Sequence, residues 1–251
     1  MPSESRIVLI TGANSGVGFA TAKVLTASSS SYHVIIGARN PAKGAEALKT
    51  LQVDPNTKGS LSTIYIDSTD ESSITAAAEE VKKRFGRLDA LINNAGIYLR
   101  SENLAWEMET QFKTNVVGPA LTTRAFMPLL LKSEKPYLVY ISSSLGSLGT
   151  AEDPGRFDYR IGAIGYRVSK LAMNMVMLEE HKEFGSQGVK VFSVCPGLVE
   201  SNLRGPGEQA RTAGGDAGPA EESGILLLNV LEGKKDDNAG KFLYKDGVRP
   251  W

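Results

Sequence analysis

The stretch TGANSGVG, residues 11–18, follows an apolar run near the N-terminus and opens a segment of helical character, 16–29. Gly12 allows the chain to turn tightly, and Gly16 lets the backbone come close to a phosphate group. Gly18 lets the helix pack closely on the strand, while the free N–H groups of the helix N-terminus would face the phosphate. A glycine-rich turn directly after the first strand predicts binding of a dinucleotide rather than a plain strand–helix connection.

Short apolar runs alternate with helical segments along the rest of the chain. The runs are apolar on successive residues, which is typical of strands covered by helices on both faces of a parallel sheet. The expected strands are 7–11, 33–38, 62–67, 88–93, 137–142, 189–194 and 241–244. The expected helices are 16–29, 41–51, 71–85, 103–132, 163–185 and 219–232. This alternation predicts a single α/β domain over 1–251, a doubly wound, Rossmann-like parallel sheet of about seven strands with helices on both faces.

Three residues mark where helices are expected to begin, end or bend. Asp70 is suited to cap the helix that starts at Glu71, and Gly86 follows the basic end of the same helix. Pro128 lies inside the segment 103–132, where it removes a backbone donor. A kink or a split of that helix is therefore expected at Pro128.

Composition argues against several classes of protein. Lys plus Arg and Asp plus Glu both number 28 in 251 residues, a neutral balance that argues against a nucleic-acid or polybasic membrane partner. The one cysteine, Cys195, excludes an internal disulfide, and with two histidines in the chain no metal site is expected. A buried, inert thiol is favoured over a redox sensor at Cys195. No targeting or membrane-spanning segment is visible, which predicts a cytoplasmic protein.

The end of the second strand bears on which dinucleotide is bound. A fold that binds NAD usually places an acidic residue there, on the ribose 2′-hydroxyl. No acid occurs from residue 34 to 45; Arg39 stands in its place, with Lys43 close by. A guanidinium can pair with a 2′-phosphate, so NADP(H) is preferred over NAD(H). The alternative is that Arg39 is an ordinary solvated surface side chain.

Tyr166 and Lys170 are the candidate chemical pair. They lie four residues apart in YRVSK, which puts them on one face of a helix. A fixed ammonium beside a phenol favours the phenolate and lowers the phenol pKa, so that Tyr166 can donate or accept a proton nearer neutral pH. Alone, this spacing also fits an exposed helix pair.

Further motifs stand at the strand ends, and together they resemble the short-chain dehydrogenase/reductase family over almost the whole chain. The matched pieces are TGANSGVG (11–18), Asp67, NNAG (93–96), Asn115, Ser143 in ISSSLG, Tyr166 with Lys170, and CPGLVES (195–201). The resemblance implies that Tyr166 is the general acid or base and that Lys170 lowers its pKa and holds the ribose. It also implies that Ser143, chosen among three serines by its spacing to Gly146, binds the carbonyl oxygen. Asn115 would hold a water in a proton relay.

The same resemblance implies contacts along the cofactor. Asp67 would meet its adenine end and Asn93 its ribose region, whereas Pro196, Gly197 and Val199 would line the nicotinamide site and Ser201 its carboxamide. The full set of expected cofactor residues is Gly12, Asn14, Ser15, Gly16, Val17, Gly18, Arg39, Asp67, Asn93, Ala95, Gly96, Tyr166, Lys170, Pro196, Gly197, Val199 and Ser201.

Two segments depart from the common family pattern. Ser143 and Tyr166 are 23 residues apart, which is longer than in many members of the family, and the extra residues fall in 150–165, within the substrate-loop region 145–165. This insertion is expected to rim the substrate pocket rather than form a surface excursion. The region 202–220 holds five glycines and two prolines and reads either as a disordered surface loop or as a mobile flap over the site. Candidate pocket residues are Tyr98, Leu145, Phe157, Tyr159, Leu198 and Leu203.

The sequence therefore predicts an NADPH-dependent carbonyl reductase or alcohol dehydrogenase whose carbonyl or alcohol substrate is apolar or aromatic. Two alternatives stay open: a cofactor-binding sensor or scaffold without catalysis, and a dehydratase, epimerase or isomerase on the same fold. The family resemblance implies a homodimer or homotetramer, although relatives with an insertion before the tyrosine can be monomers; an oligomer is favoured.

Overall fold

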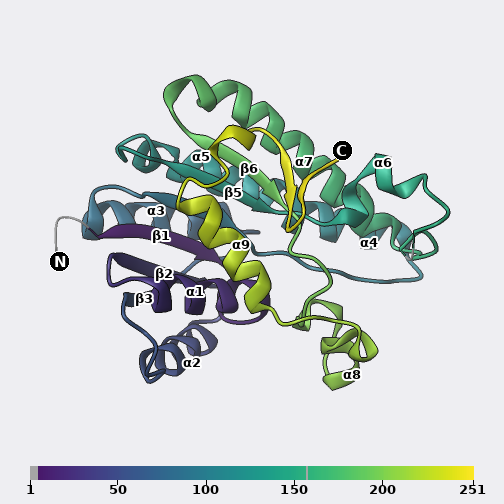
Figure 1. Cartoon of the computed structure of the whole chain (residues 1–251), viewed down its shortest axis with the longest axis horizontal. Coiled ribbons are helices and arrows are strands. Elements are labelled where there is room, and N and C mark those ends of the chain that lie inside the picture. The colour runs from purple at the N-terminus through teal and green to yellow at the C-terminus, as the bar shows by residue number, and fades with distance from the viewer. Residues whose placement is uncertain (1–4, 157) are drawn as a thin grey trace.

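A computed structural model of the chain describes residues 5–156 and 158–251. Its centre is a single sheet with the strand order β3-β2-β1-β4-β5-β6-β7-β8, parallel except for the last pair (Figure 1). The strands are β1 Arg6–Thr11, β2 Tyr32–Ala38, β3 Ser60–Tyr65, β4 Ala90–Asn93, β5 Tyr137–Ile141, β6 Lys190–Val194, β7 Phe242–Tyr244 and β8 Gly247–Arg249. The order reverses between β1 and β4, as it does in a doubly wound sheet.

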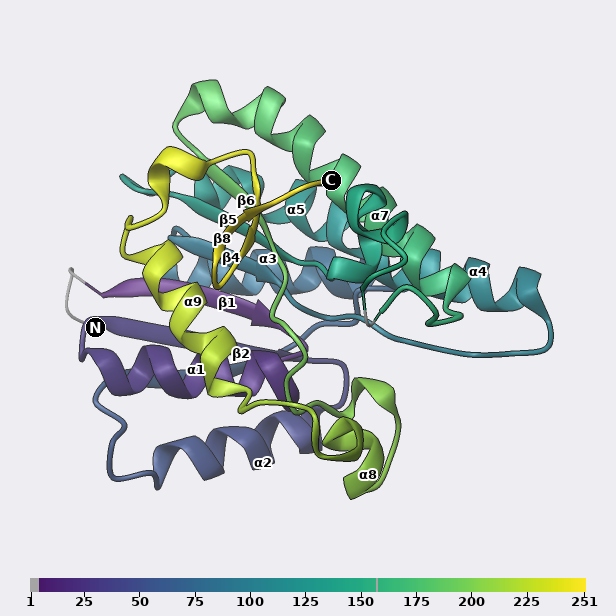
Figure 2. The same cartoon turned by 45° about the vertical axis from the view of Figure 1, so that its right-hand side comes forward.

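Helices cover both faces of the sheet (Figures 1 and 2). The helices are α1 Gly16–Ser28, α2 Pro41–Gln52, α3 Glu71–Phe85, α4 Leu104–Phe112, α5 Gly118–Leu130, α6 Leu148–Ala151, α7 Ile164–Phe184, α8 Glu208–Arg211 and α9 Glu221–Leu231. Successive residues of a strand point to opposite faces, so β1 contributes to two hydrophobic cores. Leu9 packs in the core that α3, α5 and α7 cover, and Val8 in the core that α1, α2 and α9 cover.

The fold class predicted from the sequence is confirmed, and the ends of α3 are as expected. The Asp70 carboxylate accepts a 3.0 Å hydrogen bond from the Ser72 N–H, and Gly86 ends the helix in the left-handed conformation at φ 74°. The expected split at Pro128 was wrong, because α5 continues through that residue to Leu130. The segment is interrupted instead by a π-helical turn, Lys113–Val117, between α4 and α5.

The sequence missed β8, a strand of three residues that pairs antiparallel with β7. Within the described residues, no helix has both the length and the apolar character needed to cross a lipid bilayer. All seven expected strands and the six expected helical segments are present within a few residues of their predicted bounds.

Candidate active site

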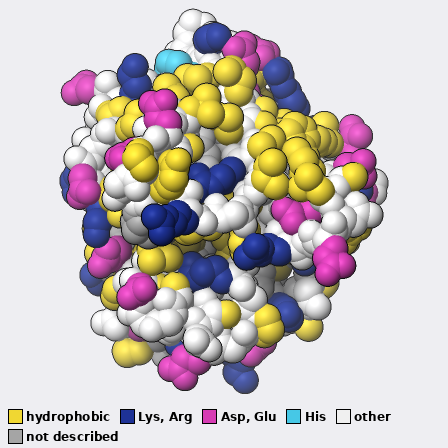
Figure 3. All heavy atoms as spheres, turned by 90° about the vertical axis from the view of Figure 1, so that its right-hand side faces the viewer, with side chains coloured by type: hydrophobic (Ala, Val, Ile, Leu, Met, Phe, Trp, Pro, Cys, Tyr) yellow, Lys and Arg dark blue, Asp and Glu magenta, His cyan; other side chains and the backbone are white. Residues whose placement is uncertain are grey.

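The parallel strands end at one edge of the sheet, and a groove of about 860 Å³ runs along that edge. The glycine-rich turn, the ends of β2, β3, β4 and β5, helix α7 and the segment after β6 all contribute to its walls. Figure 3 views this edge of the molecule, where Lys and Arg side chains gather around a hollow. This is the place at which open α/β sheets bind ligands.

The glycines of the first turn bring the backbone close to its neighbours. Gly12 and Gly16 adopt φ values of 65° and 56°, which side chains disfavour. A methyl group on Gly16 would lie 3.2 Å from Ser201 Oγ, and one on Gly12 would lie 3.0 Å from the Ala95 Cα. A methyl group on Gly18 would lie 2.9 Å from the Ala13 Cα, so this glycine packs the helix on the sheet and does not line the groove. Asn14, Ser15 and Val17 line it.

The end of β4 is fixed to the end of β1 by Asn94. Its amide donates to the carbonyl oxygens of Thr11 at 2.7 Å and of Gly12 at 3.2 Å, and Thr11 Oγ1 accepts from the backbone N–H groups of Asn94 and Ala95. Asn94 lines the groove together with Ala95 and Gly96, whereas Asn93 is buried beneath it.

Asn93 donates instead to Thr123 Oγ1 at 2.9 Å, on the α5 side of the sheet. The placement therefore disagrees with the expected ribose contact of Asn93, and Asn94 is the asparagine that faces the groove.

Arg39, Lys43 and Asp67 line the groove where the neighbouring strands β2 and β3 end. Asn40 caps α2 by accepting a 3.1 Å hydrogen bond from the Lys43 N–H, which fixes the first turn of the helix beside Arg39. Asp67 accepts from Thr69 N and Oγ1 at 2.9 and 2.8 Å. Sequence reasoning missed Glu46, which lines the groove one helical turn after Lys43.

Tyr166 and Lys170 lie on one face of α7 and are nearly buried, at 6% and 4% exposure. Lys170 Nζ donates to the Ile141 carbonyl at 2.7 Å and lies 5.8 Å from the centre of the Tyr166 ring. Burial raises the pKa of the Tyr166 phenol, with hydrogen bonding to Ser143 acting in the opposite direction. Burial also lowers the pKa of Lys170 to about 8. The direction of the Tyr166 shift is therefore opposite to the lowering expected from Lys170, and desolvation is its largest cause.

The three serines after β5 have different surroundings. Ser143 Oγ accepts from the Leu145 N–H at 3.2 Å and lies near enough to the Tyr166 phenol to lower its pKa. Ser142 is buried, and its hydroxyl has no partner among the described residues. Ser144 donates to the Asp158 carboxylate at 3.3 Å. The geometry therefore brings Ser143, and neither neighbour, to Tyr166.

Asn115 lies fully buried in the π-helical turn. Its amide accepts from Ile97 N at 2.8 Å and donates to Ile97 O at 2.9 Å and Ser169 Oγ at 3.0 Å. A methyl group on Gly96 would lie 3.2 Å from Asn115 Oδ1 and 3.5 Å from Lys170 Nζ. Asn115 therefore lies close to Lys170 and fixes the backbone after Gly96, and its role in a proton relay stays a prediction.

The segment after β6 supplies the last cofactor candidates. Pro196 and Ser201 line the groove, whereas Gly197, at φ 87°, and the buried Val199 shape the backbone behind it. Cys195 is buried, and its sulfur accepts from the Ser144 N–H at 3.2 Å. Burial raises the pKa of this thiol, which agrees with an inert, structural role.

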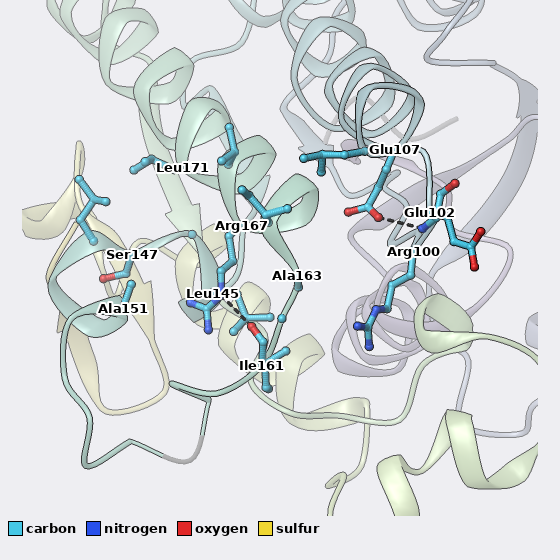
Figure 4. Close-up of a pocket in the computed structure, with 17 residues that line it drawn as sticks. Arg100, Glu102, Glu107, Leu145, Ser147, Ala151, Ile161, Ala163, Arg167 and Leu171 are labelled. Carbon is cyan, nitrogen blue, oxygen red and sulfur yellow. Dashed lines mark hydrogen bonds between the residues drawn. The ribbon is translucent and has the colours of Figure 1, made fainter.

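The candidate substrate residues fall into separate places. Tyr98 and Leu203 line the groove, and the Tyr98 ring stands edge-on to Tyr166 with ring centres 5.3 Å apart. Leu145 lines a second pocket of about 800 Å³ between α4, α6 and α7, into which Ile161 also points (Figure 4). The exposed side chains of Tyr159 and Leu198 line neither pocket. Phe157 lies outside the described residues.

The insertion before Tyr166 is joined to the catalytic turn through Asp158, a residue that sequence reasoning missed. Asp158 is 3% exposed, and its carboxylate accepts from Arg156 at 2.9 Å and from Ser144. Arg167 on α7 donates to the Asp158 carbonyl. These contacts fasten the insertion beside Ser143, so it is not an independent surface excursion.

The chain is similar in sequence and in fold to known proteins. The family model for short chain dehydrogenase matches residues 6–212. Similar curated proteins include the short-chain dehydrogenase/reductase tropE of Talaromyces stipitatus, 38% identical over 99% of both chains. Another is the short-chain dehydrogenase anuI of Penicillium roqueforti, 40% identical over 94% of this chain and 93% of that protein.

Among solved structures, the NADPH-bound carbonyl reductase from chicken fatty liver superposes with a TM-score of 0.83 at 28% identity, covering 99% of this chain and 95% of that chain. The sequence matches and the doubly wound sheet point to the same family. The chain therefore belongs to the short-chain dehydrogenase/reductase family of nicotinamide-dependent oxidoreductases.

Proposed function

We propose that this protein reduces a ketone or aldehyde to an alcohol with NADPH. The observation that carries the proposal is the meeting of the Ser143 hydroxyl and the buried Tyr166 phenol beside Lys170, at the wall of a groove long enough to reach Arg39. The groove suits a dinucleotide because Gly12 and Gly16 leave its backbone uncovered where a Cβ would crowd it.

Each residue has a defined part in the proposed reaction. The cofactor would supply a hydride to the carbonyl carbon. Ser143 Oγ donates a hydrogen bond to the carbonyl oxygen, and Tyr166 transfers its phenolic proton to that oxygen as the alcohol forms. Lys170, held by the Ile141 carbonyl, stabilises the phenolate that remains. The raised pKa keeps Tyr166 protonated at neutral pH, which is the state that a proton donor needs.

The preference for NADPH rests on Arg39 and Lys43, which line the groove where β2 and β3 end. A guanidinium can form two parallel hydrogen bonds to a phosphate, and the ammonium of Lys43 adds a second positive charge. The relative from chicken fatty liver binds NADPH. Asn94, Ala95 and Gly96 would lie along the ribose, in the part of the groove nearest Lys170.

The side chains near Tyr166 favour an apolar or aromatic substrate. Ile97, Tyr98, Leu99 and Leu203 line the same groove. The Tyr98 ring, edge-on to Tyr166, adds an apolar surface beside the phenol that suits flat or aliphatic groups.

We also propose a homodimer. Helix α7 exposes Ile164 to 54%, Val168 to 37% and Met175 to 57%, and Leu104 on the neighbouring α4 is exposed to 47%. An apolar face of this kind usually marks a contact with another protein. Light scattering should give twice the chain mass, and Met175→Glu should shift the population towards monomer; a monomeric wild type would overturn this part of the proposal.

The test of activity is NADPH consumption against aliphatic, aromatic and quinone carbonyls, with the wild type and Tyr166→Phe. The wild type should turn over at least one aromatic or aliphatic ketone, and Tyr166→Phe should bind NADPH with a similar Kd while losing most turnover. A variant that keeps near-wild-type turnover would contradict the role of Tyr166. Binding of NADPH without turnover of any carbonyl by the wild type would favour a sensor or an isomerising enzyme.

A further inference from the structure

The segment between β6 and α9 has an ordered path without a hydrophobic core of its own. Its two ends meet where Gly218 N donates to the Leu198 carbonyl and Glu200 N donates to the Gly218 carbonyl, both at 2.9 Å. None of the residues from 201 to 220 is buried, although all are described. Ordering a glycine-rich loop costs about 1–2 kcal/mol of conformational entropy for each residue, so other contacts must hold this one. Figure 2 shows the part around α8 standing off the sheet.

Arg204 supplies contacts that join the incoming limb of this loop, residues 199–204, to its outgoing limb, residues 210–218. Its Nε donates to the Ala210 carbonyl at 2.9 Å, and its Nη2 donates to the carbonyls of Val199 at 2.8 Å and Arg211 at 2.6 Å. One guanidinium thus bonds to the incoming limb at Val199 and to the outgoing limb at residues 210 and 211. Hydrogen bonds from a charged donor are stronger than neutral ones.

The limb that Arg204 holds is also a wall of the groove. The three residues immediately before it, Ser201, Asn202 and Leu203, line the groove. The Ser201 hydroxyl lies 3.2 Å from the position of a Cβ on Gly16, so the loop touches the glycine-rich turn. The positive charge of Arg204 also reaches Tyr166, where it acts to lower the phenol pKa against the larger effect of burial.

We propose that Arg204 is a positioning residue: by bridging the carbonyls of Val199, Ala210 and Arg211 it holds residues 201–203 as a preformed wall of the cofactor groove. The proposal rests on the proposed function only in taking NADPH as the ligand of the groove. Without the bridge, the loop samples open conformations. The apparent affinity for NADPH then falls in proportion to the fraction of molecules in which the wall is still formed.

Arg211 provides a matched control on the same loop. Its side chain pairs with the Glu200 carboxylate, and both are about 40% exposed. Substituting Met for Arg211 removes the same charge and an exposed ion pair but leaves the carbonyl that Arg204 uses. Arg204→Met removes both charge and bridge, whereas Arg204→Lys keeps the charge without the planar fork that can reach three carbonyls.

The experiment compares the wild type, Arg204→Met, Arg204→Lys and Arg211→Met by calorimetric titration with NADPH and by cleavage with a glutamate-specific protease at the exposed Glu208 in α8. Both Arg204 variants should bind NADPH about tenfold more weakly, as they would if the ordered fraction fell to roughly a tenth. Their cleavage after Glu208 should be faster without ligand, with unchanged circular dichroism. Arg211→Met should stay within about twofold of the wild type on both measures.

A second readout separates the loop contact from general destabilisation. Guanidinium ion at millimolar concentration should restore part of the NADPH affinity of Arg204→Ala, because it can occupy the same three acceptors, and should not change the wild type. Unchanged affinity and cleavage in Arg204→Met, or equal effects in Arg204→Met and Arg211→Met, would overturn the proposal. A wild type that binds no NADPH would refute the proposed function, while the cleavage comparison would still decide the role of Arg204.

Discussion

The ammonium of Lys170 lies 5.8 Å from the centre of the Tyr166 ring and donates a 2.7 Å hydrogen bond to the Ile141 carbonyl at the end of β5. This bond ties the catalytic face of α7 to the edge of the sheet where the groove runs. It also keeps a cation in a buried place, which lowers the pKa of Lys170 to about 8. Lys170 therefore changes from the protonated to the neutral form near pH 8.

Replacing Lys170 by Met should abolish most turnover and raise thermal stability at pH 7. The folded-state pKa lies below the ordinary value of 10.5, so the folded protein binds fewer protons than the unfolded chain between pH 8 and 10.5. Wild-type stability should rise across that window, and the advantage of the Met variant should shrink. Melting temperatures at pH 7 and pH 10 measure this; a Met variant that is less stable at both would contradict it.

Ser143→Ala should lower kcat by about 10²–10³, because removing one hydrogen-bond donor to a reacting oxygen has an effect of this size. Ser144→Ala is the matched control, since that hydroxyl bonds to Asp158 and not to Tyr166. It should keep kcat within about fivefold. Steady-state kinetics with one carbonyl substrate measure both values of kcat. A larger loss of kcat in Ser144→Ala than in Ser143→Ala would show that the role was assigned to the wrong serine.

Arg39→Asp should reverse the cofactor preference. It replaces a phosphate-binding guanidinium by a carboxylate that repels a 2′-phosphate and can accept from a ribose hydroxyl, so kcat/KM for NADPH should fall about a hundredfold. Lys49→Asp, on the last turn of α2 and away from the groove, is the control for charge reversal. The measurement is the ratio of kcat/KM for NADPH and NADH, and an unchanged ratio in Arg39→Asp would count against the phosphate site.

Asp158→Asn should raise KM for the carbonyl substrate several-fold with a smaller change in the Kd of NADPH. The Arg156 guanidinium and the Ser144 hydroxyl both donate hydrogen bonds to this buried carboxylate. Removing the charge of Asp158 weakens these bonds, so the insertion should loosen beside Ser143. Asp153→Asn changes an exposed carboxylate of the same insertion and should leave KM unchanged. Equal KM values in the two variants would show that Asp158 does not order the substrate site.

Glu180→Gln should flatten the dependence of stability on pH. Burial raises the pKa of Glu180 to about 7, above the ordinary 4.5, although Tyr140 donates a hydrogen bond to it. The folded state therefore holds an extra proton between these values, and wild-type stability should fall as pH rises from 4.5 to 7 and stay low above it. At pH 8 the Gln variant should melt higher than the wild type by several degrees.

The neighbouring Glu179, exposed and paired with Lys182, provides the control for this substitution. Glu179→Gln should keep the wild-type slope of melting temperature against pH. If the Glu180 and Glu179 variants gave the same slope, the buried carboxyl would not be the group that titrates.

Much of the fold could be predicted because its signals are local. Buried parallel strands have continuous apolar runs, as IVLIT and YLVYI do, and Asp70 and Gly86 act within one helical turn of the ends they define. The three-residue strand β8 has no such signal, since its pattern is too short and its pairing with β7 depends on a tight turn. The π-helical turn at Lys113–Val117 was missed for a similar reason: no single residue there breaks a helix.

The sequence by itself determined the doubly wound sheet, the glycine-rich turn and the pairing of Tyr166 with Lys170, because each depends on spacing along one strand, turn or helix. Only the tertiary structure decided that Asn94 rather than Asn93 faces the groove and that the pKa of Tyr166 is raised. Those outcomes depend on burial and on bonds between distant residues, such as Asn94 with Thr11. Desolvation and long-range hydrogen bonds exist only once the chain has packed, so they cannot be predicted from local sequence patterns.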